Sequence, residues 1–345
     1  MRTVHEAPVR APISRRAFLC ASLAAATRAI ARTAEARAVV PRQRVIVDND
    51  FSGDPDGLFQ LAHHLASPSV EIPFVIGSHI HADDFLDRSA RQAANAVAKV
   101  RELYATMRLA SRPPVVPGRD AGLTRQAPST PTEAARRIIA EALRTDTRLP
   151  LYYAAGAGLT DLATALMLEP RIARRMTLVW IGGMEHADLL PGVPPRRDPE
   201  YNLTIDLPAA QWIFNEADIE IWQVPRNVYR QLIVSQAELD AGLRAAGELG
   251  TFLARQLERV SALTDGALGE TYILGDSPLV TLTALQSSFE PDSASSAYVV
   301  RPTPRIADDG RYVAAAGGRP MRIYQRIDTR LTFADMFAKF AQAGL

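Results

Sequence analysis

The sequence predicts an α/β protein built on an open, mostly parallel sheet with helices on both faces. From Arg44 onward, short apolar runs alternate with longer segments of helical periodicity, which is the pattern of βαβ units. Most of the short runs are apolar at nearly every position, as expected for strands that are covered on both faces. No stretch has the composition of an interdomain linker, so we expect residues 39–345 to form a single domain.

The individual elements follow from local pattern. The predicted strands are 44–50, 72–79, 149–155, 176–181 and 219–224. The clearest helical periodicity covers 85–107, where apolar residues recur at spacings of three and four. Other helices are predicted at 57–66, 132–143, 159–168, 208–216, 236–263, 278–285 and 333–341. Between residues 296 and 326, turn dipeptides separate apolar stretches, which indicates a C-terminal β-hairpin excursion before the last helix.

Composition excludes several classes of function. The 345 residues include 39 Lys and Arg against 38 Asp and Glu, a net charge of +1, so no positive field draws the molecule to nucleic acid. The single cysteine, Cys20, cannot form an internal disulfide framework or a cysteine-based zinc site. A metal ion here would therefore need oxygen or imidazole ligands.

The first 38 residues have the layout of a twin-arginine export signal. A Ser-Arg-Arg-Ala-Phe-Leu run at 14–19 precedes an Ala-rich apolar stretch, and small-residue cleavage sites follow at 34–38. A membrane anchor is the alternative, but the apolar run at 17–27 is shorter than the roughly 20 residues that cross a bilayer. We therefore expect no stable membrane insertion and a periplasmic or secreted protein. Cleavage near Ala38 would leave 32 basic and 36 acidic residues.

Four carboxylates lie within nine residues at the end of the first predicted strand and just beyond it. Asp48, Asp50, Asp54 and Asp56 lie where that strand ends and the next helix begins, and α/β sheets bind ligands at such strand ends. Acids held in one turn repel one another unless a cation neutralises them, and hard divalent ions take oxygen ligands. The residues alone leave two interpretations open: a calcium or magnesium site, and a solvated loop in which Asp54 or Asp56 caps the helix.

Two other interpretations of this loop are weaker. An EF-hand would need a closing ligand where Phe59 stands and a helix where the strand is predicted, so we reject it. The Asp-Asn-Asp at 48–50 also resembles the Asp-x-Asp nucleophile of haloacid-dehalogenase-like phosphatases. Those enzymes need a downstream lysine to hold phosphate, and the chain offers only Lys99 and Lys339. We keep a phosphatase as a minor alternative.

Five segments in order resemble the inosine-uridine-preferring nucleoside hydrolase family. The first is the acidic loop at 48–56, where the family has Asp-x-Asp-x-x-x-Asp-Asp. The others are Tyr-Tyr-Ala-Ala-Gly-Ala-Gly-Leu-Thr-Asp-Leu-Ala at 152–163, Trp-Ile-Gly-Gly-Met at 180–184, Glu-Tyr-Asn at 200–202 and Gly-Asp-Ser-Pro-Leu at 275–279. The resemblance implies a nucleoside hydrolase-like fold and cleavage of the N-glycosidic bond of a ribonucleoside or related N-riboside.

The resemblance also implies a calcium ion (Ca2+) and a set of site residues. The ion's ligands would be Asp50, Asp54 or Asp56, the backbone carbonyl of Ala155, and Asp276. Asp50 would take a proton from water made acidic by the ion, with Asp54 or Asp56 close enough to share that work. Glu200 and Asn202 would hydrogen-bond ribose hydroxyls. Because Asp-Pro-Asp-Gly at 54–57 replaces adjacent aspartates, either Asp54 or Asp56 could hold the ion.

The chain departs from the family near the expected leaving base. Gly275 stands where the family has a histidine that helps to protonate or orient the departing base. Activation must then come from elsewhere, or the leaving group needs less help. His79 and His81 lie along the end of the second predicted strand, in the segment where the family has Gly-Asn. Their alternation predicts that both point the same way. They could contact the sugar, donate a proton or face solvent.

Two function classes remain. The first is the calcium-dependent hydrolase, and the alternative is a catalytically weakened sugar- or nucleoside-binding protein on the same fold. In both, the partner is a small-molecule nucleoside or riboside. A homo-oligomer is compatible with the resemblance, but no interface can be identified from the sequence.

Overall fold

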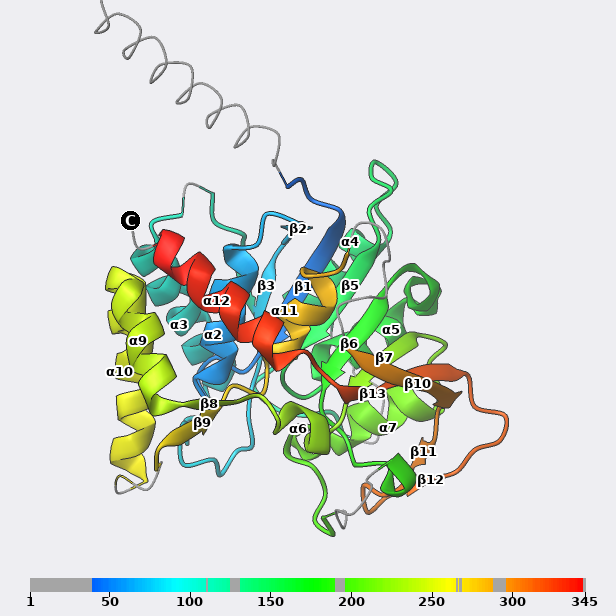
Figure 1. Ribbon diagram of the computed structural model, residues 1–345. Helices are drawn as coiled ribbons and strands as arrows, with labels where there is room; N and C mark the ends of the chain where they lie inside the picture. The colour runs from blue at the N-terminus through cyan, green and yellow to red at the C-terminus, as the bar shows by residue number, and fades with distance from the viewer. Residues whose placement is uncertain are drawn as a thin grey trace, which may run out of the picture. The chain divides into compact units, whose positions relative to one another are not determined.

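A mostly parallel sheet forms the centre of the fold, as predicted (Figure 1). The computed structural model describes residues 39–109, 111–124, 131–189, 196–264, 266, 269–287 and 296–343, so the predicted export signal lies outside it. Within these ranges the main sheet has the order β10-β13-β7-β6-β5-β1-β3-β4, and β2 also pairs with β1. Its strands are β1 (Gln43–Asn49), β2 (Val70–Glu71), β3 (Val75–Gly77), β4 (Val115–Pro117), β5 (Leu151–Ala155), β6 (Thr177–Ile181), β7 (Glu220–Val224), β10 (Ala297–Pro302) and β13 (Pro320–Arg326).

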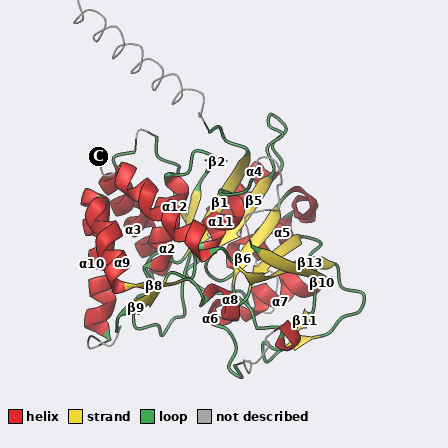
Figure 2. Ribbon diagram, in the orientation of Figure 1, coloured by secondary structure: helices red, strands yellow, loops and turns green. Residues whose placement is uncertain are grey.

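Helices cover both faces of this sheet (Figure 2). They are α2 (Asp56–Leu65), α3 (Gln92–Met107), α4 (Glu133–Ala142), α5 (Thr160–Leu168), α6 (Tyr201–Ile205), α7 (Leu207–Asn215), α8 (Arg226–Tyr229), α9 (Gln236–Ala245), α10 (Gly247–Leu263), α11 (Pro278–Thr283) and α12 (Thr329–Ala343). Val45 and Val47 of β1 pack in one core cluster with side chains of α2, α3, α9, α10 and α12. Ile46 packs in the other, with α4, α5 and α7. The alternation of β1 residues thus separates two buried layers.

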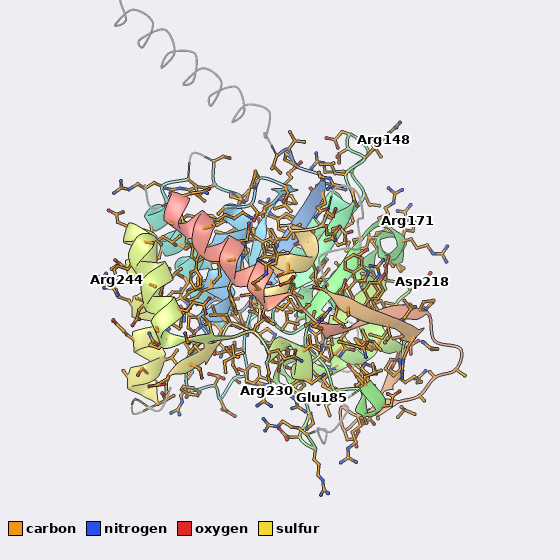
Figure 3. The ribbon with its side chains drawn as sticks, in the orientation of Figure 1. Arg148, Arg171, Glu185, Asp218, Arg230 and Arg244 are labelled. Carbon is orange, nitrogen blue, oxygen red and sulfur yellow. The ribbon has the colours of Figure 1, made fainter. Side chains whose placement is uncertain are left out.

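Residues from distant parts of the chain meet where the parallel strands end. β1 lies between β3 and β5, and Asp48 near its end is opposite both Ile76 and Ala155. Because β3, β5, β6 and β7 run parallel to one another or to β1, the loops that follow them gather at the same edge of the sheet. Charged side chains such as Arg171, Asp218 and Arg244 lie at the outside of the fold (Figure 3).

Two predicted helices differ from the structure. The helix predicted at 85–107 begins only at Gln92, because the preceding segment forms turns in which Asp84 and Asp87 side chains accept backbone N–H groups two residues on. The helix predicted at 236–263 is two helices. It is broken at Gly247, whose φ of +58° is left-handed.

The C-terminal hairpin excursion is confirmed and joins the main sheet. β10 and β13 pair antiparallel, and β13 continues the sheet by pairing parallel with β7. Between them lies a short ladder of β11 (Arg305–Ile306) and β12 (Tyr312–Val313). A second small ladder, β8 (Ile233–Ser235) with β9 (Thr271–Ile273), was not expected from the sequence. In the part of the chain that the structure describes, no helix is long and apolar enough to cross a bilayer.

The packing of α12 gives a test of this core. Phe340 is fully buried, and its ring lies 6.4 Å from that of Phe59 on α2. We expect Phe340→Ala to lower the free energy of unfolding by about 3–5 kcal/mol, because it removes a buried ring and leaves a cavity. Chemical denaturation measures the loss. Val313→Ala, at a residue 52% exposed, is the control, and similar losses for both variants would contradict the packing described.

Candidate active site

A cavity of about 310 Å³ opens where the strands end. Its lining includes the carboxylates Asp50, Asp54, Asp56, Asp84, Glu200 and Asp276. All of these except Asp84 were predicted from the sequence as site residues, and the structure brings all six to one cavity. A more open cleft of about 980 Å³ lies elsewhere, beside Met184 and Tyr312, and its lining includes neither Asp50 nor Asp276.

Asn49 connects the two acids that are furthest apart in sequence. Its Nδ2 donates to Asp276 Oδ2 at 2.8 Å across 227 positions, and its Oδ1 accepts the backbone N–H of Asp50 at 2.8 Å. Asp276 in turn donates its backbone N–H to Asp56 Oδ2 at 3.1 Å. One fully buried amide therefore contacts both the first and the last acid of the site. Asn49 was not predicted as a site residue. Its position between two aspartates at the end of a predicted strand is the feature of the sequence that could have identified it.

Two glycines make room for this arrangement. A Cβ added to Gly156 would lie 2.3 Å from Asn49 Nδ2 and 2.8 Å from Asp276 Oδ2. A Cβ added to Gly57 would lie 2.9 Å from Asn49 Nδ2. Side chains at either position would displace the amide. Ala155, the proposed carbonyl ligand, ends β5 directly before Gly156.

The acids carry strongly perturbed proton affinities. Burial raises the pKa of Asp50 well above its usual value, and the negative charge of Asp276 raises it further. Burial also raises the pKa of Asp276 to about 7. The pKa of Asp56 is raised well above its usual value, first by burial and then by Asp276. Each acid is thus held in a site where a second negative charge is unfavourable.

The donor chemistry fits a hard divalent cation. Among the ion pairs within the described ranges, none joins a Lys, Arg or His to Asp50, Asp56 or Asp276, so no side-chain cation compensates these acids. Oxygen is also the donor that calcium prefers. The same ranges contain no three Asp, Glu, His or Cys side chains already arranged around a metal position.

Asp54 and Asp56 occupy different positions. Asp54 is exposed, and its Oδ1 accepts from the Tyr272 hydroxyl at 2.9 Å and from the Asp56 backbone N–H at 3.2 Å. Asp56 begins α2 and is bonded to the backbone of Asp276. The alternative in which Asp54 or Asp56 simply caps a helix does not describe Asp56, whose carboxylate contacts a distant segment of the chain.

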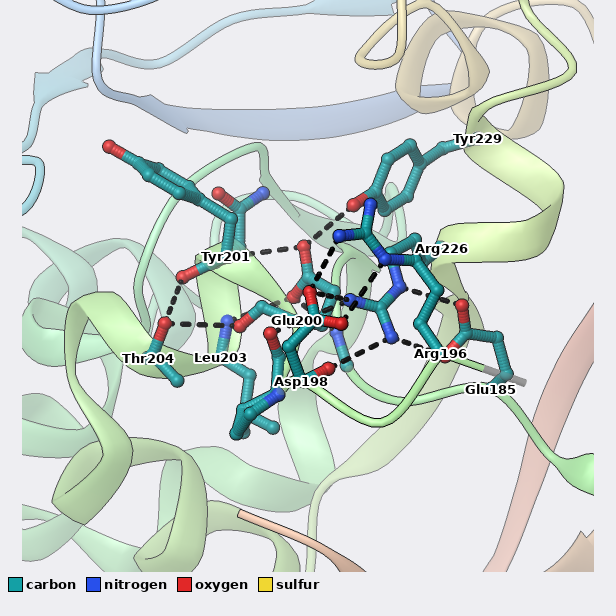
Figure 4. A network of polar contacts seen from close by, with 12 residues as sticks. Glu185, Arg196, Asp198, Glu200, Tyr201, Leu203, Thr204, Arg226 and Tyr229 are labelled. Atoms are coloured by element: carbon teal, nitrogen blue, oxygen red, sulfur yellow. Dashed lines mark hydrogen bonds and ion pairs between the residues drawn. The ribbon is translucent and has the colours of Figure 1, made fainter. Parts of the chain in front are cut away.

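Glu200 is held rigidly at the start of α6 (Figure 4). Its Oε1 accepts from the Tyr229 hydroxyl at 2.8 Å and from Asn202 N at 3.1 Å, while its Oε2 accepts from Gly183 N at 2.8 Å and Leu203 N at 2.9 Å. It is 1% exposed, and burial raises its pKa despite these donors. Four donors fill the lone pairs of this carboxylate.

Asn202 reaches the cavity from the same helix. Its Nδ2 donates to the carbonyls of Ile181 at 2.7 Å and Gly156 at 3.1 Å. Both amide hydrogens are used, so the group that Asn202 can offer to a ligand is its Oδ1 acceptor.

The structure does not place His79 in the cavity. β3 ends at Gly77, so the strand alternation assumed for the two histidines does not extend to them. His79 is buried, with Nε2 3.1 Å from Thr160 Oγ1 and Nδ1 3.0 Å from the carbonyl of Ile80. Ile80, between the histidines, lines the cavity instead. The expected substrate contact of His79 is therefore not supported.

His81 also lies outside the cavity lining. Its Nε2 is 3.1 Å from Thr204 Oγ1, and its ring contacts the ring of Tyr201 edge-on, with centroids 4.7 Å apart. It supports Tyr201, which does line the cavity. The expected direct contact of His81 with a ligand is therefore not supported, because Tyr201 and not His81 lines the cavity.

Asp48 is unsuited to the phosphatase alternative. It is fully buried, accepts hydrogen bonds from Ser78 Oγ and the Tyr153 hydroxyl, and does not line the cavity. Burial and the charge of Asp161 raise its pKa to about 7. A nucleophile must reach its substrate, and Asp48 does not.

Comparison with known proteins gives the family. A family model described as inosine-uridine preferring nucleoside hydrolase matches residues 45–332. The chain belongs to this family. No curated protein matches the sequence significantly.

Solved nucleoside hydrolases share the fold. The plant nucleoside hydrolase PpNRh1 is 17% identical with a TM-score of 0.64, covering 87% of this chain and 99% of its own. The purine-preferring ribonucleoside hydrolase from Gardnerella vaginalis is 17% identical, with a TM-score of 0.65 and coverages of 88% and 99%. The inosine-uridine preferring nucleoside hydrolase from Bacillus anthracis is 19% identical, with a TM-score of 0.61 and coverages of 87% and 99%. The fold class is confirmed.

Asn49 provides a test of the buried site in this nucleoside hydrolase-family chain. We expect Asn49→Asp to lower the free energy of unfolding by about 2–4 kcal/mol without added metal, because it places two buried carboxylates in contact. Denaturant unfolding in chelator measures the effect. Asn95 is a matched control, since it donates to Asp87 Oδ2 at 2.9 Å but is exposed. Equal losses in Asn49→Asp and Asn95→Asp would show that burial is not what makes Asn49 important.

Proposed function

We propose that this chain is a calcium-dependent hydrolase that cleaves the N-glycosidic bond of a ribonucleoside or related N-riboside. Family membership and fold support N-glycosidic hydrolysis. The observation that carries the proposal is that Asp50, Asp56 and Asp276 line one cavity and are linked through Asn49 and the backbone of Asp276. The calcium requirement rests on the oxygen-only donor set.

The ion would be held by Asp50, Asp56, Asp276 and the carbonyl of Ala155. We assign Asp56 rather than Asp54 because Asp56 is bonded to Asp276, whereas Asp54 is exposed and bonded to Tyr272. When bound, calcium would supply positive charge that makes a nearby water more acidic, and it would coordinate sugar hydroxyls.

Asp50 would accept the proton of the attacking water. Its carboxylate lines the cavity beside Asp56 and Asp276, and the charge of a bound cation would keep it ionised and therefore able to accept that proton. As the C1′–N bond lengthens, positive charge develops on the ribose ring, and the surrounding carboxylates stabilise it. Asp54, which lines the same cavity, would share the proton-accepting work of Asp50.

Glu200 and Asn202 would orient the sugar. Because the lone pairs of Glu200 are filled in this structure, a ribose hydroxyl can bind it only by displacing the Tyr229 hydroxyl. Asn202 offers Oδ1 as an acceptor. The rigid placement of both residues at the start of α6 would fix the ring relative to Asp50.

We also propose export, on the basis of the twin-arginine pattern at 14–19 and the cleavage sites at 34–38. Export through this route would place residues 39–345 in the periplasm or outside the cell. Replacing both Arg15 and Arg16 by lysine should retain the uncleaved chain in the cytoplasm, which fractionation and N-terminal sequencing would detect.

A binding protein is the second candidate, and Gly275 favours it. A glycine at the cavity wall cannot transfer a proton to a departing base. Incubation with a panel of ribonucleosides separates the two candidates, because ligand-induced thermal stabilisation without release of reducing sugar would identify a binder.

The hydrolase predicts a large effect at Asp50. We expect Asp50→Asn to reduce kcat by about 10²–10⁴-fold, because it removes the group that takes the proton. Release of reducing sugar from ribonucleosides measures it. Asp218→Asn, at an exposed carboxylate outside the cavity (Figure 3), should leave the rate unchanged. An active Asp50→Asn enzyme would refute the assigned role.

Metal removal gives a further test. Treatment with chelator should abolish sugar release, and added calcium should restore it and raise the melting temperature, because the ion neutralises buried acids in the folded state. Magnesium is the comparison ion. Full activity in chelator would contradict the calcium requirement.

A further inference from the structure

The charge of the cavity is strongly one-sided. Its lining contains six carboxylates and, among the described residues, no lysine, arginine or histidine. A single divalent cation at Asp50, Asp56 and Asp276 would offset only two negative charges. The other acids include Asp84, which lies on the loop that follows β3. The field inside the cavity therefore favours a positively charged ligand.

The hydrogen-bond donors of the lining side chains are already in use. Tyr201 donates its hydroxyl to Asp84 Oδ2 at 2.6 Å, and Tyr229 donates its hydroxyl to Glu200 Oε1 at 2.8 Å. Asn202 donates both amide hydrogens to backbone carbonyls. These tyrosine and amide donors all face protein acceptors. The carboxyl groups of Asp50, Asp56 and Asp276 would be deprotonated as ligands of the proposed cation, so none of these groups offers a proton to a leaving base.

Gly275, which also lines the cavity, has no side chain that could donate a proton in place of these groups. A Cβ built there would lie 3.3 Å from Tyr229 Cδ2 and 3.4 Å from Asp56 Oδ2, so this backbone directly borders both. A base that leaves as an anion would lie beside negatively charged carboxylates, with no side chain available to protonate it. A neutral nucleoside, whose base departs as an anion unless it is protonated, is therefore poorly served by this cavity.

The rest of the lining suits a flat cation. Phe85, Tyr201 and Tyr229 are aromatic, and Ile80 and Ile273 are apolar. Aromatic faces attract cations, most strongly where water is partly excluded. The volume of about 310 Å³ is at the small end of the range for small-molecule sites, which fits a riboside of a single-ring base.

We propose that the substrate is a riboside whose leaving base is already positively charged, of the N-ribosylpyridinium class. This inference rests on the proposed hydrolase function and specifies its substrate. The C1′–N bond breaks, and its electron pair goes to the ring nitrogen, which becomes neutral. The oxygen of water bonds to C1′, and the water's proton passes to Asp50 and then to solvent. The products are ribose, a neutral pyridine and one proton, so no leaving-group acid is required.

The test compares nicotinamide riboside with inosine and uridine in the presence of calcium. The quantity compared is kcat/KM divided by the rate constant of uncatalysed hydrolysis of the same riboside, so that intrinsic lability does not account for a preference. We expect this ratio for nicotinamide riboside to exceed the ratios for inosine and uridine by about 100-fold, since a missing general acid costs neutral substrates about that much. Inosine or uridine equal to or better than nicotinamide riboside, while hydrolysis persists, overturns this inference and leaves the hydrolase intact.

A second measurement examines charge without chemistry. 1-Methylnicotinamide and nicotinamide differ by one methyl group and one positive charge, and we expect the cation to be the stronger competitive inhibitor. Asp84→Asn should reduce that advantage several-fold, whereas Asp83→Asn, at an exposed neighbour outside the lining, should not. An equal advantage in both variants, or none in the unmodified protein, overturns the inference. Failure to hydrolyse any riboside overturns the proposed function and this inference together.

Discussion

The site depends on holding like charges together in a buried place. Asp50 and Asp56 lie more than two hundred residues before Asp276 in the chain, and the mutual repulsion of the three acids raises the free energy of the folded state. The amide of Asn49 and the backbone N–H of Asp276 provide the hydrogen bonds that offset part of it. The surrounding backbone is shaped around this contact, because Gly57 and Gly156 leave space that only an unsubstituted Cα allows.

The parallel sheet explains how such distant residues meet. β1 supplies Asp48 and Asn49 at its end, and its neighbour β5 supplies Ala155 in register with Asp48. The acid at the start of α2 and the acid before α11 then approach from loops above the same edge. The strands are buried on both faces and closely packed, so the backbone positions from which the carboxylates extend are held in place.

The sequence was sufficient for the features that local pattern determines. Continuous apolar runs predicted β1, β3, β5, β6 and β7 but not the shorter β2 and β4, and helix periodicity predicted α2, α4, α5 and α7 within one or two residues. The sequence pattern was insufficient where individual side-chain hydrogen bonds end an element or where a strand is very short. The loop before α3 departs from helix because Asp84 and Asp87 bond local backbone, and β8 and β9 are too short to give a period. His79 was misplaced because β3 ends two residues before it.

The acidic and the apolar parts of the cavity lining are built by different means. The acidic part rests on strand termini and on buried hydrogen bonds, so a change there alters the position of the reacting groups. The apolar part of the lining includes Ile80 and Phe85 from the loop after β3, Val260 of α10 and Ile273 of β9. Those side chains meet across loops and contribute apolar surface rather than directed hydrogen bonds. In the proposed hydrolase, substitutions of these apolar side chains should therefore alter the preference for the base more than they alter the positions of Asp50 and Asp276.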